Sequence, residues 1–273
     1  MPEFLLELYS EEIPPQLQIN ARNQLKEHFK KTLEDNGLQN LDCLEYSSPT
    51  RLTIYIKGLP EKLKIKASEI RGPKNGVEKN ILEGFIKSRN ISKKDLFIKN
   101  TEKGEFYFAK TAEKDLFMED LLVDILPQAL SSIGWKKSMK WSTNNLMWGR
   151  PLRSIFAIFN GKKLPFKYHH LVSNEFVLIE QDLDTKTQKI KSFKEYCSFL
   201  KNNKIVLDQN ERKKIILKKF NSVAKLKNYK EQYRESLLEE VVNIVEEPHV
   251  LLVNFDKEYL KIPEEIIIST LEK

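Results

Sequence analysis

The stretch that decides the fold is Arg153-Ser-Ile-Phe-Ala-Ile-Phe-Asn-Gly-Lys-Lys-Leu-Pro-Phe-Lys-Tyr168. Its first half is rich in β-branched and aromatic residues, which are typical of a strand. Asn160-Gly161 then supplies the residue pair that a two-residue hairpin turn favours. The sequence therefore predicts two antiparallel strands, over residues 153–160 and 163–168.

Hairpins and helices alternate along the rest of the chain. Hydrophobic periodicity predicts helices at residues 16–36, 78–88, 116–133, 193–200, 209–225 and 235–245, and one opened by Pro263. It predicts further strands at residues 3–8, 41–46, 52–56, 63–70, 96–100, 105–111 and 250–254. Because many strands are joined by hairpins, we expect an α+β fold with mixed antiparallel sheets and packed helices, not a doubly wound parallel sheet. We place an α+β region at 1–170 and a mostly helical region at 171–273.

Composition indicates a globular protein. The chain has 273 residues, of which 40% are hydrophobic, and this is enough to bury a sizeable core. Because it has no apolar run of membrane-spanning length and its N-terminus is unlike a signal peptide, we expect a cytoplasmic protein that does not enter a membrane. Cys43 and Cys197 lie far apart and have no zinc-ligand spacing, so we interpret both as structural thiols.

The net charge of +7 is distributed unevenly. Residues 186–230 contain 14 Lys or Arg and three acidic residues, whereas residues 231–273 contain 11 acidic and four basic residues. A polyanion such as RNA would be attracted to the first segment and repelled by the second.

A Trp-rich segment, residues 135–153, contains three tryptophans and five basic residues in 19 positions. The indoles could stack on exposed bases while Lys136, Lys137, Lys140 and Arg150 meet phosphates. Alternatively, the indoles anchor packing and the basic residues are solvated around them. Neighbouring apolar residues such as Met139 and Leu146 favour packing.

The helix expected at 209–225 is amphipathic. Ile216, Phe220 and Val223 follow one side, and most of its basic residues lie elsewhere on the helix. These basic residues either form a solvated face or bind RNA, and the excess of positive charge supports the second interpretation. The RNA-binding candidates on this helix are Arg212, Lys214, Lys218, Lys219 and Lys225.

Motifs for catalysis by this chain alone are not evident. Adjacent residues on an extended chain point to opposite faces, so Glu11-Glu12 is better explained as a loop leading into a helix than as an acid–base pair. His169-His170 has no further ligand at metal-binding spacing, and the sequence has neither a phosphate-binding loop nor a Gly-x-Gly-x-x-Gly motif. We therefore predict no catalytic residues, no metal site and no ATP site.

Five short motifs carry a resemblance to a known family. They are Leu5-Leu-Glu-Leu-Tyr-Ser-Glu-Glu-Ile-Pro-Pro15, Ser48-Pro-Thr-Arg-Leu52, Arg71-Gly-Pro73, Met139-Lys-Trp141 with Arg150-Pro-Leu152, and Val245-Glu-Glu-Pro248. In this order they resemble the β subunit of bacterial tetrameric glycyl-tRNA synthetase, over essentially the whole chain. One departure is Ser173-Asn-Glu-Phe176, where the family usually has Gly-His-Arg-Phe, so any role of that His and Arg is in doubt here.

The resemblance implies an N-terminal fragment of a larger multidomain chain. It further implies a tRNA-binding and structural subunit that, with an α subunit in an α2β2 heterotetramer, attaches glycine to tRNA(Gly). In this family ATP and Mg bind the partner α subunit. The alternatives are a free-standing RNA-binding module without a synthetase partner and, by analogy of fold alone, an editing-like domain.

Overall fold

The structure is a computed structural model that describes residues 2–65, 69–88, 91–102, 104–110, 114–181, 184–230 and 232–271. The chain divides into two compact units. Unit 1 comprises Met1–Leu59 and Leu122–Lys273, and unit 2 is the insertion Pro60–Leu121. The 170/171 boundary expected from the sequence falls inside unit 1, and it stays a prediction about domain organisation.

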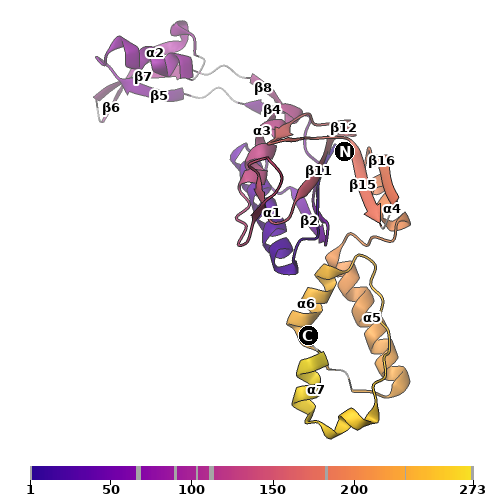
Figure 1. The fold of residues 1–273 in the computed structure, drawn as a ribbon. Coiled ribbons are helices and arrows are strands. Elements are labelled where there is room, and N and C mark those ends of the chain that lie inside the picture. The colour runs from indigo at the N-terminus through magenta and orange to yellow at the C-terminus, as the bar shows by residue number, and fades with distance from the viewer. Residues whose placement is uncertain are drawn as a thin grey trace. The chain divides into compact units, whose positions relative to one another are not determined.

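Unit 1 is built around an antiparallel sheet in which the described strands follow the order β12-β11-β1-β3-β2 (Figure 1). The strands are β1 (Glu3–Ser10), β2 (Asp42–Ser48), β3 (Arg51–Lys57), β11 (Leu152–Phe159) and β12 (Lys162–Lys163). The predicted hairpin is present, because β11 and β12 pair across Asn160-Gly161 and both turn residues have positive φ. Its second strand is shorter than expected, and residues 167–168 pair instead with β14 (Leu171–Val172).

One face of this sheet is covered by helix α1 (Pro15–Asp35). Alternation along β1 places Phe4, Leu6 and Leu8 on this face, where Phe4 and Phe29 lie 5.3 Å apart between ring centroids. The predicted four-residue period is confirmed, since the residues at that spacing are buried: Leu17, Ala21, Leu25, Phe29 and Leu33. Gly37 ends the helix with φ of +85°, as its glycine predicts.

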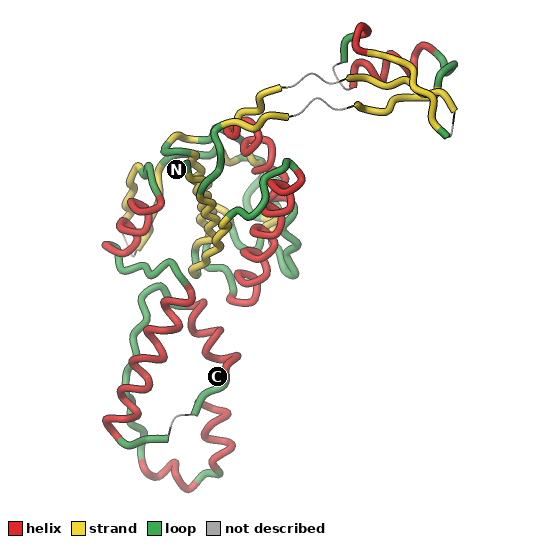
Figure 2. Tube along the Cα trace, turned by 180° about the vertical axis from the view of Figure 1, so that it is seen from behind, coloured by secondary structure: helices red, strands yellow, loops and turns green. Residues whose placement is uncertain are grey.

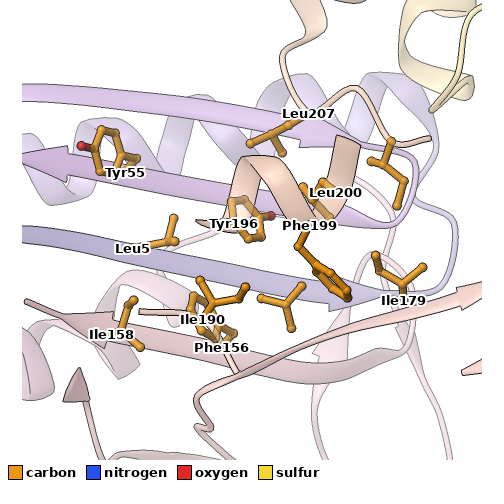
Figure 3. Close-up of a cluster of buried hydrophobic side chains, with 12 residues drawn as sticks. Leu5, Tyr55, Phe156, Ile158, Ile179, Ile190, Tyr196, Phe199, Leu200 and Leu207 are labelled. Carbon is orange, nitrogen blue, oxygen red and sulfur yellow. The ribbon is translucent and has the colours of Figure 1, made fainter. Parts of the chain in front are cut away.

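The opposite face holds a second apolar cluster (Figure 3). Leu5 of β1 and Phe156 of β11 meet helix α4 (Phe193–Asn202) and the hairpin of β15 (Phe176–Gln181) with β16 (Asp184–Lys189). Tyr196, Phe199 and Leu200 are the α4 residues in this cluster. The sheet is therefore the middle layer of a three-layer core.

The remaining described helices of unit 1 are α5 (Gln209–Lys227), α6 (Glu235–Ile244) and α7 (Glu264–Leu271), with a short η2 (Lys257–Lys261). Helix α6 packs against both α5 and α1. Asp208 caps α5 by accepting a hydrogen bond from the backbone N–H of Asn210, and Asn228 ends it in the left-handed conformation.

Unit 2 contains the antiparallel sheet β5-β7-β6 with helix α2 (Lys79–Ser88) on one side (Figure 2). Its strands are β5 (Glu69–Lys74), β6 (Leu96–Thr101) and β7 (Gly104–Lys110), and η1 (Lys93–Asp95) precedes β6. A separate pair is formed by β4 (Lys62–Ile65) and β8 (Lys114–Phe117). The unit boundary falls inside α3 (Met118–Ser131).

The α+β class is confirmed, with antiparallel pairing in each named sheet. Three details of the sequence prediction are wrong. Residues 250–254 do not form a strand. The single strand expected at 63–70 is replaced by β4 and β5, and residues 66–68 lie outside the described residues. Residues 116–117, expected at the start of a helix, belong to strand β8. The β15–β16 hairpin was not predicted, because β16 consists of exposed polar residues and lacks the apolar alternation of a half-buried strand.

Short pairs complete the fold: β9 (Met139–Lys140) with β10 (Met147–Trp148), and β13 (Lys167–Tyr168) with β14 (Leu171–Val172).

Candidate nucleic-acid interface

A buried ion cluster joins the first sheet to the segment after α6. Arg51 is 1% exposed, and its Nε lies 3.2 Å from the Glu7 carboxylate while its Nη1 lies 3.1 Å from Glu246. Its Nη2 donates to the backbone carbonyl of Leu178 at 2.7 Å. The Tyr196 hydroxyl donates to Glu7 at 2.5 Å, so α4 is also tied to the cluster.

Burial sets the protonation of these groups. It raises the pKa of the Glu7 carboxyl above its ordinary value, against the opposing effects of Arg51 and the Tyr196 hydroxyl. It opposes the charge on Arg51, but the Glu7 and Glu246 carboxylates outweigh it and raise the pKa of the guanidinium. Arg51 is therefore a fixed buried cation, and its removal would leave the Glu7 carboxylate without the cation that lies beside it.

Sequence motifs far apart in the chain meet at this cluster. Glu7 comes from the opening motif, Arg51 from Ser48-Pro-Thr-Arg-Leu52, and Glu246 from Val245-Glu-Glu-Pro248. Sequence analysis did not assign the cluster. The available signal was a charged residue inside or beside an apolar strand, as with Glu7 between Leu6 and Leu8.

The opening motif and Pro49 of Ser48-Pro-Thr-Arg-Leu52 also line a pocket of about 560 Å³. Its walls are the loop before α1, Pro49, Arg150 and the C-terminal end of α6, and the lining residues are Glu11, Glu12, Ile13, Pro14, Pro15, Pro49, Arg150, Asn243 and Ile244. Glu11 is in the loop leading into the helix, as expected, and pairs with Arg153 at 2.9 Å. Two of the cluster's motifs, the opening motif and Ser48-Pro-Thr-Arg-Leu52, thus contribute both to the buried ion cluster and to this pocket.

Two of the three tryptophans of the Trp-rich segment pack against other parts of the same segment. Trp148 is 1% exposed, and its ring centroid lies 5.0 Å from that of Trp135. Trp135 in turn packs so closely on Gly149 that a Cβ atom there would lie 2.5 Å from the indole ring. Trp141 is half-buried, with its ring centroid 6.1 Å from that of His170. These contacts favour the packing interpretation for Trp135 and Trp148.

The basic residues of this segment are accessible to different degrees. Lys136 and Lys137 are exposed, and the exposed Lys140 donates to the Asn145 side chain at 2.8 Å. Arg150 is half-buried in the pocket wall. The end of α6 lines the same pocket, and α6 packs on α5.

Helix α5 presents its lysines on two sides. At about 100° per residue, Lys214, Lys218 and Lys225 fall within about 40° of one another, and all three are exposed. Lys219 lies on another side, where its Nζ donates to the backbone carbonyl of Pro248 at 3.1 Å. Lys213 is neutralised by Glu235 and Glu239 of α6. We call Lys214, Lys218 and Lys225 the lysine stripe; these exposed side chains form a positive surface of this helix.

Arg212 is not part of that surface. It is 0% exposed, and its guanidinium donates to the backbone carbonyls of Val242, Val206, Leu207 and Ser47. Its sequence-based interpretation as a phosphate ligand is therefore corrected: Arg212 fastens α5 to the sheet and to α6. A helix-face argument counts an arginine as solvated because the sequence alone does not reveal the carbonyl groups that surround it.

Comparison with known proteins identifies the family. Residues 4–273 match the family model described as glycyl-tRNA synthetase beta subunit. The chain belongs to this family. It is 33% identical to the glycine–tRNA ligase beta subunit of Clostridioides difficile (98% of this chain, 40% of that protein) and 32% identical to that of Rickettsia canadensis (100% and 41%). It is also 33% identical to that of Dictyoglomus turgidum (99% and 40%). The chain thus spans about 40% of the length of these glycine–tRNA ligase β subunits.

The departure from the family's Gly-His-Arg-Phe motif is accommodated within the fold. Ser173 is buried, and its hydroxyl donates to the Leu164 carbonyl at 2.6 Å. Asn174 bridges to Phe156 on the edge of the sheet, and Glu175 pairs with Lys189 at 2.7 Å. This β-subunit chain therefore uses the segment to close the edge of β11 and to fasten the β15–β16 hairpin.

Three observations bear on other classes of site. No helix among the described residues is long and apolar enough to span a membrane. Within the same part of the chain, no group of three or more His, Cys, Asp or Glu side chains is arranged to bind a metal ion. Both cysteines are free thiols, and burial raises the pKa of Cys43 to about 12 and that of Cys197 to about 11.

Proposed function

We propose that this chain is the tRNA-binding and structural part of a glycine–tRNA ligase β subunit. With an α subunit in an α2β2 assembly, the β subunit would attach glycine to tRNA(Gly) using ATP in the cytoplasm. The family membership supports this proposal most directly. The relatives are named beta subunits, which implies an α partner for those proteins.

In this proposal the two subunits have different tasks. The α subunit binds glycine, ATP and Mg, and this chain supplies no catalytic residue. The proposed tRNA contacts are the exposed or half-buried basic side chains Lys136, Lys137, Lys140, Arg150, Lys214, Lys218, Lys219 and Lys225. The three-residue lysine stripe of α5 is the strongest element, because its charges face one direction and none of the three forms an ion pair within the part of the chain that the structure describes.

Salt dependence of tRNA binding tests the stripe. Each phosphate contact contributes about 0.7 to 0.9 to the slope of log K against log salt. We expect Lys214→Gln/Lys218→Gln/Lys225→Gln to reduce that slope by about 2 to 3 for labelled tRNA(Gly). The matched control replaces the exposed Lys30, Lys31 and Lys162 by Gln, which leaves the same net charge. An equal loss of slope in both variants would contradict the assignment, because net charge alone would then explain binding.

A further inference from the structure

The sheet of unit 2 carries an aromatic and basic surface on one face. Residues directly opposite in antiparallel strands share a face, so Phe97 with Phe108 and Lys99 with Phe106 lie on the same side of the sheet, as does Arg71 with Phe108. Together with Lys110 these form the aromatic–basic face: Arg71, Phe97, Lys99, Phe106, Phe108 and Lys110.

Helix α2 packs on the other side of this sheet. Phe85 of α2 lies against Gly72, at a position where a Cβ atom would be 2.7 Å from the ring. Alternation along β5 places Ile70 and Gly72 on the face opposite to Arg71. Ala109, which pairs with Ile70 and shares its face, is fully buried. The helix therefore uses the Gly72 side and leaves the aromatic–basic face to make other contacts.

The aromatic rings of this face are already in contact with cations. The Arg71 guanidinium lies 3.7 Å from the centroid of the Phe106 ring, and the Lys99 and Lys110 ammonium groups lie 5.5 Å from Phe108 and 5.8 Å from Phe97. Arg71, Lys99 and Lys110 are exposed, while the three rings are half-buried. A guanidinium plane on a phenyl ring is a platform on which a nucleobase stacks, with N–H groups at its edge for phosphate.

The charges on the aromatic–basic face indicate which class of ligand it binds. Glu69 is the acidic residue on this face, and it pairs with Lys99 at 2.8 Å, which leaves Arg71 and Lys110 to attract an anion. An acidic peptide would satisfy the charges but would leave the planar rings without stacking partners. An unpaired nucleic-acid strand satisfies both, since every base has a π face and every link a phosphate.

We propose that the aromatic–basic face of unit 2 binds single-stranded RNA. The site is separate from the lysine stripe of α5, and it rests on the proposed function only for the identity of the natural RNA, an unpaired segment of tRNA. Arg71 stacked on Phe106 forms its centre. Lys110 holds a flanking phosphate, while Lys99 stays paired with Glu69.

Binding of a labelled ten-nucleotide oligouridine to the 273-residue chain tests this site. We expect Arg71→Gln/Lys110→Gln to weaken binding on the order of tenfold or more, through lost stacking and charge. The matched control is Lys79→Gln/Lys87→Gln, which removes two exposed charges from α2, and it should change affinity less than twofold. Equal weakening in both variants, weakening in neither, or displacement of the oligomer by polyglutamate as readily as by RNA would overturn the proposal.

A second readout separates stacking from charge. An oligouridine with one central 2-aminopurine should lose fluorescence on binding, because stacking quenches that base. Phe106→Leu keeps every charge and an apolar side chain, so we expect it to reduce the quenching while the salt dependence stays unchanged. Full quenching with Phe106→Leu would contradict a stacking role. Oligouridine binding that persists when the lysine-stripe variant loses tRNA affinity would show that the two proposals succeed or fail separately.

Discussion

Replacing Arg51 by Met tests the buried ion cluster that holds the sequence motifs together. The change keeps much of the side-chain volume but removes the cation that lies 3.2 Å from Glu7 and 3.1 Å from Glu246. Both Arg51 and Glu7 have side chains only 2% exposed, so the Glu7 carboxylate would lose its counter-ion with almost no access to water. Breaking such a pair from one side costs about 3 to 5 kcal/mol.

Urea unfolding followed by tryptophan fluorescence measures this loss in unit 1. All three tryptophans lie outside residues 60–121, so the signal reports unit 1. The control is Arg153→Met, whose exposed pairs with Glu11 and Glu180 should contribute no more than about 1 kcal/mol. Adding Glu7→Gln to Arg51→Met removes the stranded charge, so we expect the double variant to be about 1 to 3 kcal/mol more stable than Arg51→Met.

Two results would refute this reasoning. One is an Arg51→Met variant that loses no more stability than Arg153→Met. The other is a double variant that is less stable than Arg51→Met alone, because the buried charge would then not be the source of the loss.

Three further predictions concern unit 1 and helix α2. Gly149→Ala should cost about 1 to 3 kcal/mol, because its Cβ would lie 2.5 Å from the Trp135 ring, whereas Gly84→Ala, with open space around it, should be neutral or stabilising in thermal melts. Arg212→Met should destabilise the chain by about 2 to 4 kcal/mol in urea titrations by leaving buried carbonyls unpaired, and a loss under 1 kcal/mol would contradict its structural role. Burial raises the pKa of Cys43 from 9.0 to about 12, so the folded state keeps this proton longer than the unfolded state, and stability that is intact below pH 9 should fall between about pH 9 and 12. Cys43→Ala should make that fall shallower by up to about 1.4 kcal/mol per pH unit, and an unchanged slope would count against it.

The elements of the fold that depend on local signals were predictable from the sequence. The Asn160-Gly161 hairpin, the four-residue period of α1 and the Asp208 cap of α5 each result from residues close together in the chain. The insertion of unit 2 between β3 and the rest of unit 1 was not predicted, because the boundary of a compact unit depends on contacts between residues far apart in the chain. Residues 250–254 have the apolar content of a strand, yet they pair with no neighbour in the described structure.

The candidate site was predictable only in part. Exposed lysines on one helix face follow from spacing alone, as Lys214 and Lys218 show. Sequence spacing does not encode contacts between residues far apart in the chain. The burial of Arg212 against backbone carbonyls depends on such contacts, and so does the ion cluster of Glu7, Arg51 and Glu246. Pairing across a sheet likewise determines which aromatic rings of unit 2 share a face with Arg71.

Glycylation of tRNA(Gly) by the α subunit, measured with and without the β subunit that carries these residues, tests the central claim most directly. We predict that α alone activates glycine but charges tRNA poorly, that adding the β subunit restores charging, and that the triple Gln variant of the lysine stripe raises the KM for tRNA. A β subunit that activates glycine without α, or that leaves charging by α unchanged, would contradict the account.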